Sequence, residues 1–445
     1  MPSTSSTFTF GRYRIDASNE SIVFLYSLVH GDEAFSFEER MIVPGLSTGA
    51  DSGLLKSVLD ALHLMLGISY WKTFCPGIID TGEIALTKDQ AAFWNTLYTK
   101  GLGEFFYTNK IDFRRLVQFP VSKTTTPNPL KLPTQDKSLV GLGGGKDSIV
   151  SSELLKKNHK DFSLVSLDAR DIHRRVAEII GKPLIEVTRE IDPNLYAVNR
   201  RGDVYNGHVP VSAIYAFVDL FLAVIGGYRY IVASNEESAN YPNTQYLGEE
   251  INHQWSKTLE FETLFQRYVS DYITPDITYF SLLRPMKEIK IVELFSKLEQ
   301  YFSSFSSCNA NFFRHVETPR SLWCGTCPKC VFVFLLLSAF IPKDRLLTIF
   351  GMNLYARESL LPTFRELLGL TGVKPFDCVG TPEEGRFALH KASQSGQYDS
   401  DTCMQILHWE IGDQWNRLPA LREKLFSLPQ NHRIPTSFQK SLANL

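Results

Sequence analysis

The hydrophobic and polar positions of the chain form two successive patterns. Up to about residue 119, segments with strand-like alternation, FTFGRYRID and SIVFLYSLVH, precede segments with helical spacing, GLLKSVLDALHLMLG and KDQAAFWNTLYTKGLGEFFY. This mixture predicts an N-terminal α+β domain, with an accessory or substrate-binding role, over residues 1–119. Residues 120–137 contain four prolines and a run of threonines, a composition that predicts an extended linker.

From residue 138 onward, short apolar segments alternate with amphipathic ones. SLVGL, DFSLVSLD, PLIEVTRE and YRYIVASNEE are predicted to contain strands, and DSIVSSELLKK, VPVSAIYAFVDLFLAVIGG and RPMKEIKIVELFSKL to form helices. This alternation indicates an α/β fold in which helices cover a parallel sheet, here over residues 138–307. Residues 331–445 have a mostly helical pattern and end in a polar tail.

Composition and charge narrow the classes of partner. The 445 residues suffice for two or three domains, because single cores usually stop growing near ~250 residues. A hydrophobic content of 44% and a net charge of -2 give no overall attraction to nucleic acid or an anionic membrane. The longest apolar run, residues 331–341, is far shorter than the ~20 residues that span a bilayer. Since the N-terminus shows no secretory signal pattern, we expect a cytoplasmic protein.

The segment LVGLGGGKDSIVSSELL, residues 139–155, places three glycines between a predicted strand and a predicted helix. The first N–H groups of a helix are unpaired and lie at the positive end of its dipole, so such a turn is suited to bind phosphate. It is not the common GxxxxGK[ST] loop, because Gly141 is one position too close to Lys146 and Asp147 replaces Ser or Thr, and it lacks GxGxxG spacing. A plain turn whose glycines only permit tight packing is the alternative. The turn comprises Gly143, Gly144, Gly145, Lys146, Asp147 and Ser148.

Four of the seven cysteines crowd into residues 308–330. Cys308 is followed sixteen positions later by Cys324, and Cys327 and Cys330 follow with two residues in each gap. Paired CxxC turns present thiolates to one ion, so four cysteines in this pattern predict a structural Zn²⁺ site. A four-iron cluster and a disulfide redox couple are the alternatives. Buried thiols are expected at the scattered cysteines, which are Cys75, Cys378 and Cys403.

Three polar segments lie close to predicted strand ends or helix starts, at residues 199–213, 233–243 and 251–257. The carboxyl ends of parallel strands meet at one edge of a sheet, where ligands bind in open α/β folds, so these segments are expected to converge above the glycine turn. Asp168 ends a predicted strand and is expected at the same edge. Turn formation, helix capping and structural ion pairs are the alternatives for any single residue. The candidates are Asn206, His208, Asn235, Glu236, His253, Lys257 and Arg284.

Residues 143–148, GGGKDS, resemble the SGGxDS signature of the PP-loop ATP pyrophosphatases, with Gly143 in place of the leading serine. This resemblance implies a fold that binds ATP, holds pyrophosphate at the turn and transfers AMP to a carboxyl or carbonyl oxygen. It also implies that Asp147 lies near Mg²⁺ (or Mn²⁺), Ser148 near a phosphate oxygen and Asp168 near the adenosine. The cysteine pattern is similar to the zinc knuckle of the 7-cyano-7-deazaguanine synthases, which supports zinc.

Over residues 65–380 the chain resembles the UDP-N-acetylmuramoyl-L-alanyl-L-glutamate epimerases. The segments that carry this resemblance are GGGKDSIV, NGHVPVSAI, SNEESA, NHQWSK, YFSLLRP, WCGTCPKCVFVFL and KPFDCVG. The resemblance implies ATP-dependent inversion of the terminal L-glutamate of a UDP-linked muramoyl dipeptide, for peptidoglycan synthesis. A carboxylate disfavours a neighbouring carbanion, whereas conversion to an acyl-adenylate makes the Cα proton removable.

Inversion requires groups that accept and deliver protons on both faces of Cα, or one mobile base. Arginine suits substrate binding, because it holds a carboxylate or diphosphate with a bidentate fork. The proton-transfer candidates are His208, Glu236 and His253, with Lys146 as a further catalytic residue. The substrate-binding candidates are Asn206, Asn235, Lys257 and Arg284.

Three other functions fit the same motifs. A PP-loop amide-forming or nucleobase-modifying enzyme of the 7-cyano-7-deazaguanine synthase type would transfer nitrogen to its substrate. A non-catalytic nucleotide sensor would bind ATP and position the flanking domains. The same epimerisation could also act on the C-terminal residue of another small peptide. The sequence gives no sign of the oligomeric state.

Overall fold

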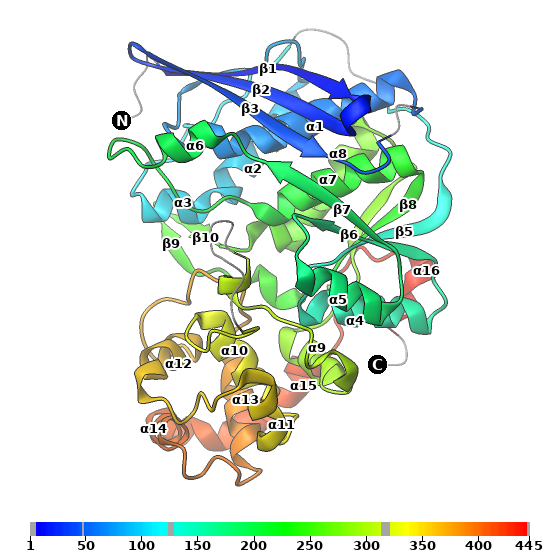
Figure 1. The fold of residues 1–445 in the computed structure, drawn as a ribbon. Coiled ribbons are helices and arrows are strands. Elements are labelled where there is room, and N and C mark those ends of the chain that lie inside the picture. The colour runs from blue at the N-terminus through cyan, green and yellow to red at the C-terminus, as the bar shows by residue number, and fades with distance from the viewer. Residues whose placement is uncertain (1–5, 47–48, 123–128, 313–320, 443–445) are drawn as a thin grey trace.

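In the computed structural model of the chain, residues 6–46, 49–122, 129–312 and 321–442 are described. One nine-stranded sheet runs through the molecule in the order β11–β8–β5–β6–β7–β3–β2–β1–β4 (Figure 1). Its strands are β1 (Ser6–Asp16), β2 (Ser21–His30), β3 (Glu33–Ile42), β4 (Ile78–Asp80), β5 (Gln135–Gly141), β6 (Phe162–Leu167), β7 (Leu184–Glu190), β8 (Tyr228–Ala233) and β11 (Thr278–Ser281). A separate hairpin pairs β9 (Thr244–Tyr246) with β10 (Glu249–Ile251).

The parallel part of the sheet consists of β11, β8, β5, β6 and β7. Its central strands are buried on both faces: within β5, Leu139 belongs to the core on one side of the sheet and Val140 to the core on the other. Successive side chains of a strand point to opposite faces, so such strands need continuous apolar runs. The predicted α/β class with a parallel sheet is therefore confirmed.

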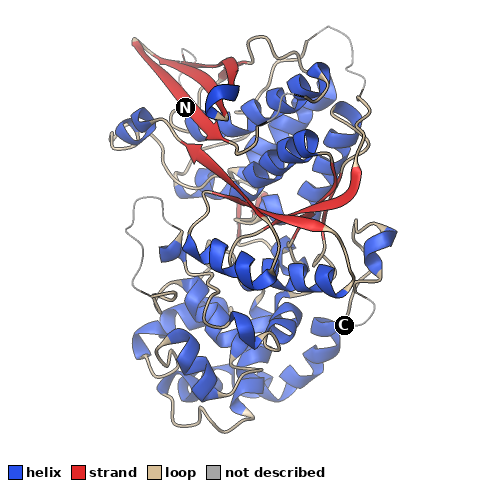
Figure 2. Cartoon of the chain, turned by 45° about the vertical axis from the view of Figure 1, so that its right-hand side comes forward, coloured by secondary structure: helices blue, strands red, loops and turns tan. Residues whose placement is uncertain are grey.

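Helices lie on both sides of the parallel strands (Figure 2). One side is covered by α1 (Ser52–Trp71), α2 (Lys88–Gly101), α3 (Gly103–Thr108), α7 (Val211–Gly226) and α8 (Leu259–Tyr272). The other side is covered by α4 (Lys146–Lys157), α5 (Asp171–Ile180) and α9 (Glu288–Phe295), which pack against the C-terminal helices. The short helix α6 (Pro193–Val198) follows β7.

The N-terminal strands continue the parallel sheet. Strand β3 pairs antiparallel with β7 through Arg40–Glu190, Met41–Arg189 and Ile42–Thr188. Beside this pairing, the buried guanidinium of Arg189 donates to both carboxylate oxygens of Glu39, with Nε–Oε1 at 2.6 Å and Nη2–Oε2 at 3.0 Å. Residues 1–119 were expected to form a domain of their own. They share one sheet and one apolar core with the parallel strands instead.

The described part of the predicted linker runs along the surface of this core without helix. Leu130 N–H donates to the carbonyl oxygen of Ile273 at 3.0 Å, and Gln135 N–H donates to that of Gly227 at 2.8 Å. The last three residues assigned to the linker already belong to β5. Residues 123–128 lie outside the described residues.

The C-terminal region is helical, as predicted, and forms a lobe below the sheet in Figure 1. None of the helices among the described residues is long and apolar enough to cross a membrane. The helices of this lobe are α10 (Pro328–Leu337), α11 (Lys343–Phe350), α12 (Leu361–Leu367), α13 (Pro382–Ser393), α14 (Thr402–Ile411) and α15 (Leu421–Phe426); the last helix, α16 (Thr436–Gln439), lies near β8.

The ion pair beside β3 and β7 yields a stability prediction. Glu39→Gln leaves the buried Arg189 guanidinium without its counter-charge, so we expect the free energy of unfolding to fall by about 3 kcal/mol in urea titrations. The matched control is Glu83→Gln, which breaks the exposed Arg12–Glu83 pair and should leave the unfolding midpoint unchanged. Equal losses in the two variants would contradict the proposed role of burial.

Candidate active site

A cavity of about 630 Å³ opens at the carboxyl edge of the parallel strands. Its walls come from the glycine turn after β5, from the ends of β6 and β8, from α7 and from the segments around Ser306, Lys329 and Cys378. This is the edge at which open α/β sheets bind ligands. Predicted site residues that line it are Gly143, Gly145, Lys146, Asp147, Ser148, Asp168, Asn206, Asn235, Glu236 and Lys257.

The glycine turn joins β5 to α4 in a conformation that needs glycine. Gly144 has φ 72°, and a Cβ there would lie 3.3 Å from Cγ1 of Ile172. A Cβ on Gly145 would lie 2.9 Å from the Ser307 hydroxyl, so the backbone is packed too closely for a side chain. Among the described residues, no side chain caps the start of α4 at Gly145. A helix start without a side-chain cap is suited to bind an anion.

The buried Lys146 side chain forms ion pairs with two carboxylates. Its ammonium lies 2.8 Å from Asp147 Oδ1 and 2.7 Å from Glu288 Oε1, and its side chain is 3% exposed. Burial alone would lower the pKa of Lys146, but these two carboxylates outweigh burial and raise it. The lysine is therefore a fixed positive charge beside the turn. Its predicted catalytic role stays a prediction.

Two buried glutamates also lie in this region, and both have raised pKa values. Burial raises the pKa of Glu236, and burial together with the nearby carboxylates raises the pKa of Glu288 to about 8. Burial lowers the pKa of Lys257, but the negative charges of Cys378, Glu236 and Asp147 outweigh burial and raise it. The cavity thus holds alternating acidic and basic groups that are sheltered from water.

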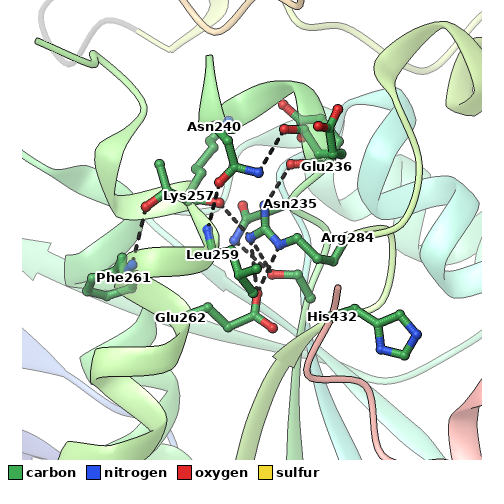
Figure 3. Close-up of polar contacts among 12 residues, drawn as sticks. Asn235, Glu236, Asn240, Lys257, Leu259, Phe261, Glu262, Arg284 and His432 are labelled. Atoms are coloured by element: carbon green, nitrogen blue, oxygen red, sulfur yellow. Dashed lines mark hydrogen bonds and ion pairs between the residues drawn. The ribbon is translucent and has the colours of Figure 1, made fainter. Parts of the chain in front are cut away.

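Arg284 is not among the described residues that line the cavity, and Figure 3 shows its polar contacts with neighbouring residues. Its guanidinium is 1% exposed and donates to the carbonyl oxygens of Glu236 at 2.7 Å and Lys257 at 2.6 Å. It also forms an ion pair with Glu262 at 3.0 Å. The donors of Arg284 are directed at protein acceptors, and its predicted binding of substrate stays a prediction. Arg284 positions two residues that do line the cavity.

His208 and His253 come together, but neither is among the described residues that line the cavity. Their ring centroids are 4.6 Å apart, and both Nδ1 atoms face Glu104 on α3, with His208 at 3.3 Å. Burial and the neighbouring His253 lower the pKa of His208 to about 3, so it is neutral. The pKa of His253 is raised to about 9, because hydrogen bonds to Cys378 and Glu104 outweigh burial. Direct contact of either histidine with substrate, as predicted, is not supported.

The other predicted residues hold the cavity edge in place. Asp168 has φ 55° and accepts a hydrogen bond from Arg189 N–H at 2.8 Å. Asn235 donates to the Ser281 hydroxyl at 3.1 Å, and the Asn206 side-chain oxygen accepts from Lys72 Nζ at 3.2 Å. Each of the three still lines the cavity, so the predicted convergence at this edge is observed.

Sequence reasoning missed two groups in the cavity wall. Cys378 was expected to be one of three buried thiols, yet it lines the cavity, while Cys75 and Cys403 are buried. Asp219 on α7 has a pKa raised to about 8 by burial and lines the cavity near Gly141. The available signal was the KPFDCVG motif for Cys378. For Asp219 the signal was an acid within the apolar segment AFVDLFL.

The four clustered cysteines form a compact thiol group. Their sulfur atoms lie within 4.8 Å of one another, with Cys324–Cys330 at 3.7 Å and Cys327–Cys330 at 3.5 Å. Four sulfurs ~2.3 Å from one tetrahedral ion are ~3.8 Å apart, so the spacing fits a single zinc ion. A four-iron cluster, which binds each thiolate at a different iron, needs wider spacing. None of these four forms a disulfide.

The cysteine cluster is joined to the glycine turn through Ser306. Ser306 N–H donates to the Gly144 carbonyl oxygen at 3.1 Å, and Cys308 N–H donates to the Ser306 hydroxyl at 3.0 Å. The Ser306 hydroxyl in turn donates to the Leu322 carbonyl oxygen at 2.6 Å. An ion bound by the cysteines would therefore stiffen the segment that closes one side of the turn.

Family models match almost the whole chain. A MurL N-terminal domain covers residues 1–282, and a MurL C-terminal domain covers residues 304–421.

The chain belongs to the MurL family.

Three MurL relatives are named UDP-N-acetyl-alpha-D-muramoyl-L-alanyl-L-glutamate epimerase. The protein from Xanthomonas oryzae pv. oryzae is 35% identical over 433 residues, which are 97% of this chain and 95% of the relative. Those from a Micromonospora species and from Salinispora tropica are also 35% identical, over 98% of this chain and 97% and 96% of their own lengths.

The glycine turn provides a matched pair of variants. Gly144→Ser forces a side chain onto a left-handed residue, so we expect a loss of about 1–3 kcal/mol in the free energy of unfolding. Gly143→Ser is the control, because φ of Gly143 lies outside that region and its Cβ would meet no heavy atom of the described residues within 4 Å. Urea denaturation measures both. A loss in Gly143→Ser as large as that in Gly144→Ser would contradict this view of the turn.

Proposed function

We propose that this member of the MurL family inverts the terminal L-glutamate of UDP-N-acetylmuramoyl-L-alanyl-L-glutamate to D-glutamate for peptidoglycan synthesis. The observation that carries the proposal is the similarity to three epimerases over at least 95% of each chain. The cavity supports it, because an anion-binding turn and groups suited to proton transfer open into the same space. Since inversion leaves composition unchanged, the enzyme is an isomerase.

The reaction requires activation of the glutamate carboxylate. The negative charge of a free carboxylate opposes carbanion formation at the adjacent Cα, so the proton there is hardly acidic. Transfer of AMP from ATP to the carboxylate, in the manner of PP-loop enzymes, removes that charge. The carbonyl of the acyl-adenylate then accepts electron density when Cα loses its proton. Hydrolysis after inversion yields AMP and the epimerised peptide.

The residues of the turn fit ATP and a divalent cation. The unblocked N–H groups at the start of α4 would hold the departing pyrophosphate, with the fixed charge of Lys146 beside them. Asp147 is part-exposed in the cavity and offers oxygen ligands. Mg²⁺ usually binds one or two carboxylates together with substrate phosphates, and it supplies neutralisation of phosphate charge. Ser148 and Asp168 line the same cavity, where the phosphate and the adenosine would bind.

The proposed metal of the cysteine cluster is zinc in a structural role. Its sulfur spacing fits one tetrahedral ion, and four thiolate ligands leave no open position for catalysis. Through Ser306, the ion would keep the segment beside Gly144 in place. Zinc therefore supports the nucleotide site without taking part in the reaction.

The proposed function predicts three linked products. Incubation with ATP, Mg²⁺ and UDP-N-acetylmuramoyl-L-alanyl-L-glutamate in deuterated water should release AMP and pyrophosphate. It should also yield D-glutamate with one deuterium at Cα, as chiral analysis after hydrolysis would show. Lys146→Met should lower AMP release at least about 100-fold, because it removes a fixed charge from the site of the departing pyrophosphate. Lys88→Met, at an exposed position of α2, is the control. A product that gains nitrogen without Cα exchange would contradict the proposal.

The zinc site gives a second prediction. The purified protein should contain about one zinc per chain by elemental analysis. Cys327→Ser should lower both zinc content and melting temperature, because a tetrahedral site loses one of four ligands. It should also weaken ATP binding through the link to Gly144. Cys403→Ser, a buried cysteine outside the cluster, should retain zinc. Iron with labile sulfide in place of zinc would be the opposing result.

A further inference from the structure

Cys378 is held in the cavity wall by an anchored segment of the C-terminal lobe. It lies between α12 and α13, and the backbone on both sides of it is fixed by side chains from the β9–β10 region. Asn243 Nδ2 donates to the Pro375 carbonyl oxygen at 2.7 Å, and Gln254 Nε2 donates to the Val379 carbonyl oxygen at 3.2 Å. These contacts give the Cys378 thiol a fixed place beside the substrate space.

A histidine and a glutamate stand behind this thiol. The His253 ring lies close enough to the Cys378 side chain for each group to shift the pKa of the other, and its Nδ1 contacts Glu104 Oε2 in an ion pair. His253 N–H donates to Asn243 Oδ1 at 2.8 Å, which fixes the residue that carries the ring. Because Glu104 engages Nδ1, Nε2 is the ring atom available to the thiol. The arrangement has the form of an activated cysteine: a thiol, a neighbouring imidazole, and a third group that orients the imidazole.

The surroundings of Cys378 favour its thiolate. Burial raises the pKa of the thiol, but Lys257, Lys329 and His253 outweigh burial and lower it well below the usual range. The charge of Lys257 acts on Cys378 and also on Asp147 of the glycine turn. One lysine therefore links the thiol to the turn, so a substrate whose carboxyl is activated at the turn has the thiol nearby.

We propose that Cys378 is a catalytic residue whose Sγ takes the Cα proton of the activated glutamate, with His253 and Glu104 as positioning residues. This assignment rests on the function proposed above. The C–H bond breaks, its electron pair moves onto the carbonyl oxygen of the activated carboxyl, and the proton forms the S–H bond. A proton from water on the opposite face then restores the C–H bond. The thiol returns its proton through His253 to water, so protons balance over one turnover.

The assignment explains features that packing does not require. A buried structural cysteine needs no base, whereas Cys378 faces a histidine, two lysines and the cavity. It also gives His253 a role although its ring does not line the cavity. His208, which is neutral and contacts both His253 and Glu104, completes the packing around the ring.

The test separates activation from proton transfer in the full-length protein. Cys378→Ser, assayed with ATP, Mg²⁺ and UDP-N-acetylmuramoyl-L-alanyl-L-glutamate in deuterated water, should retain AMP release within about threefold. Deuterium incorporation at Cα should fall about 100-fold or more, since positioned acid–base groups contribute about 10²–10⁴-fold. Cys403→Ser is the matched control, because this buried cysteine lies outside the cavity and should leave both rates unchanged.

A second measurement does not depend on turnover. In the wild type, iodoacetamide followed by peptide mass mapping should alkylate Cys378 at least about 10-fold faster than Cys403 at neutral pH, since the thiolate is the nucleophile. Glu104→Gln should slow that alkylation and shift the pH profile of Cα exchange, while AMP release stays near the wild-type rate. A structural role for Glu104 would lower all three together.

Each opposing outcome identifies what has failed. Equal loss of AMP release and Cα exchange in Cys378→Ser, or unchanged exchange, would overturn the assignment while the proposed function stands. A glutamyl thioester on Cys378 in denatured, turning-over wild type would overturn it in favour of a nucleophile. A wild type that releases no AMP and inverts no glutamate would overturn the proposed function and the assignment with it.

Discussion

The buried Arg284 guanidinium is the contact on which the cavity depends. It joins its own segment to two others, through the carbonyl oxygen of Glu236 and through the Lys257 carbonyl oxygen and the nearby Glu262 carboxylate. A buried charge is tolerated only when it is paired and hydrogen-bonded, and here the pairing sets the path of two cavity loops (Figure 3). Arg284 thus holds the backbone of Lys257, whose side-chain charge acts on both Asp147 and Cys378.

A second constraint acts from the opposite side of the turn. The cysteine cluster and Gly144 share Ser306, so the backbone of the glycine turn is tied to the cysteine cluster. Gly144 needs its left-handed conformation, and Gly145 has no room for a side chain. Both demands are local, but the packing that imposes them comes from Ile172 and Ser307, which are distant in sequence.

The sequence predicts those parts of the fold whose signal is local. Strands β5 and β6 are recognisable because burial on two faces produces apolar runs, and the glycine turn is recognisable because its spacing is a motif. Strand β3, EAFSFEERMI, has a mixed polar pattern, and its pairing with β7 depends on contacts such as Arg189–Glu39, 150 residues apart, that no local pattern encodes. The same limit applies to the prediction for Arg284. An arginine is suited to bind a substrate carboxylate, but in the folded protein Arg284 is buried and its partners are protein groups. A role for a single cysteine such as Cys378 can be inferred only from its neighbours Lys257 and His253, which folding brings beside it.

The division of the cavity between the two halves of the chain follows from the chemistry. Residues matched by the N-terminal family model supply the turn, Lys146, Glu236 and Lys257, and those matched by the C-terminal model supply Ser306, Lys329 and Cys378. In the proposed reaction, activation of the glutamate carboxylate needs an anion-binding turn. Removal of the Cα proton needs a base whose negative charge is not neutralised by the groups at that turn. Placing the thiol on a separate lobe keeps it apart from the turn while Lys257 bridges them. Because residues of both halves line the cavity, the cavity forms only when the two halves are packed together.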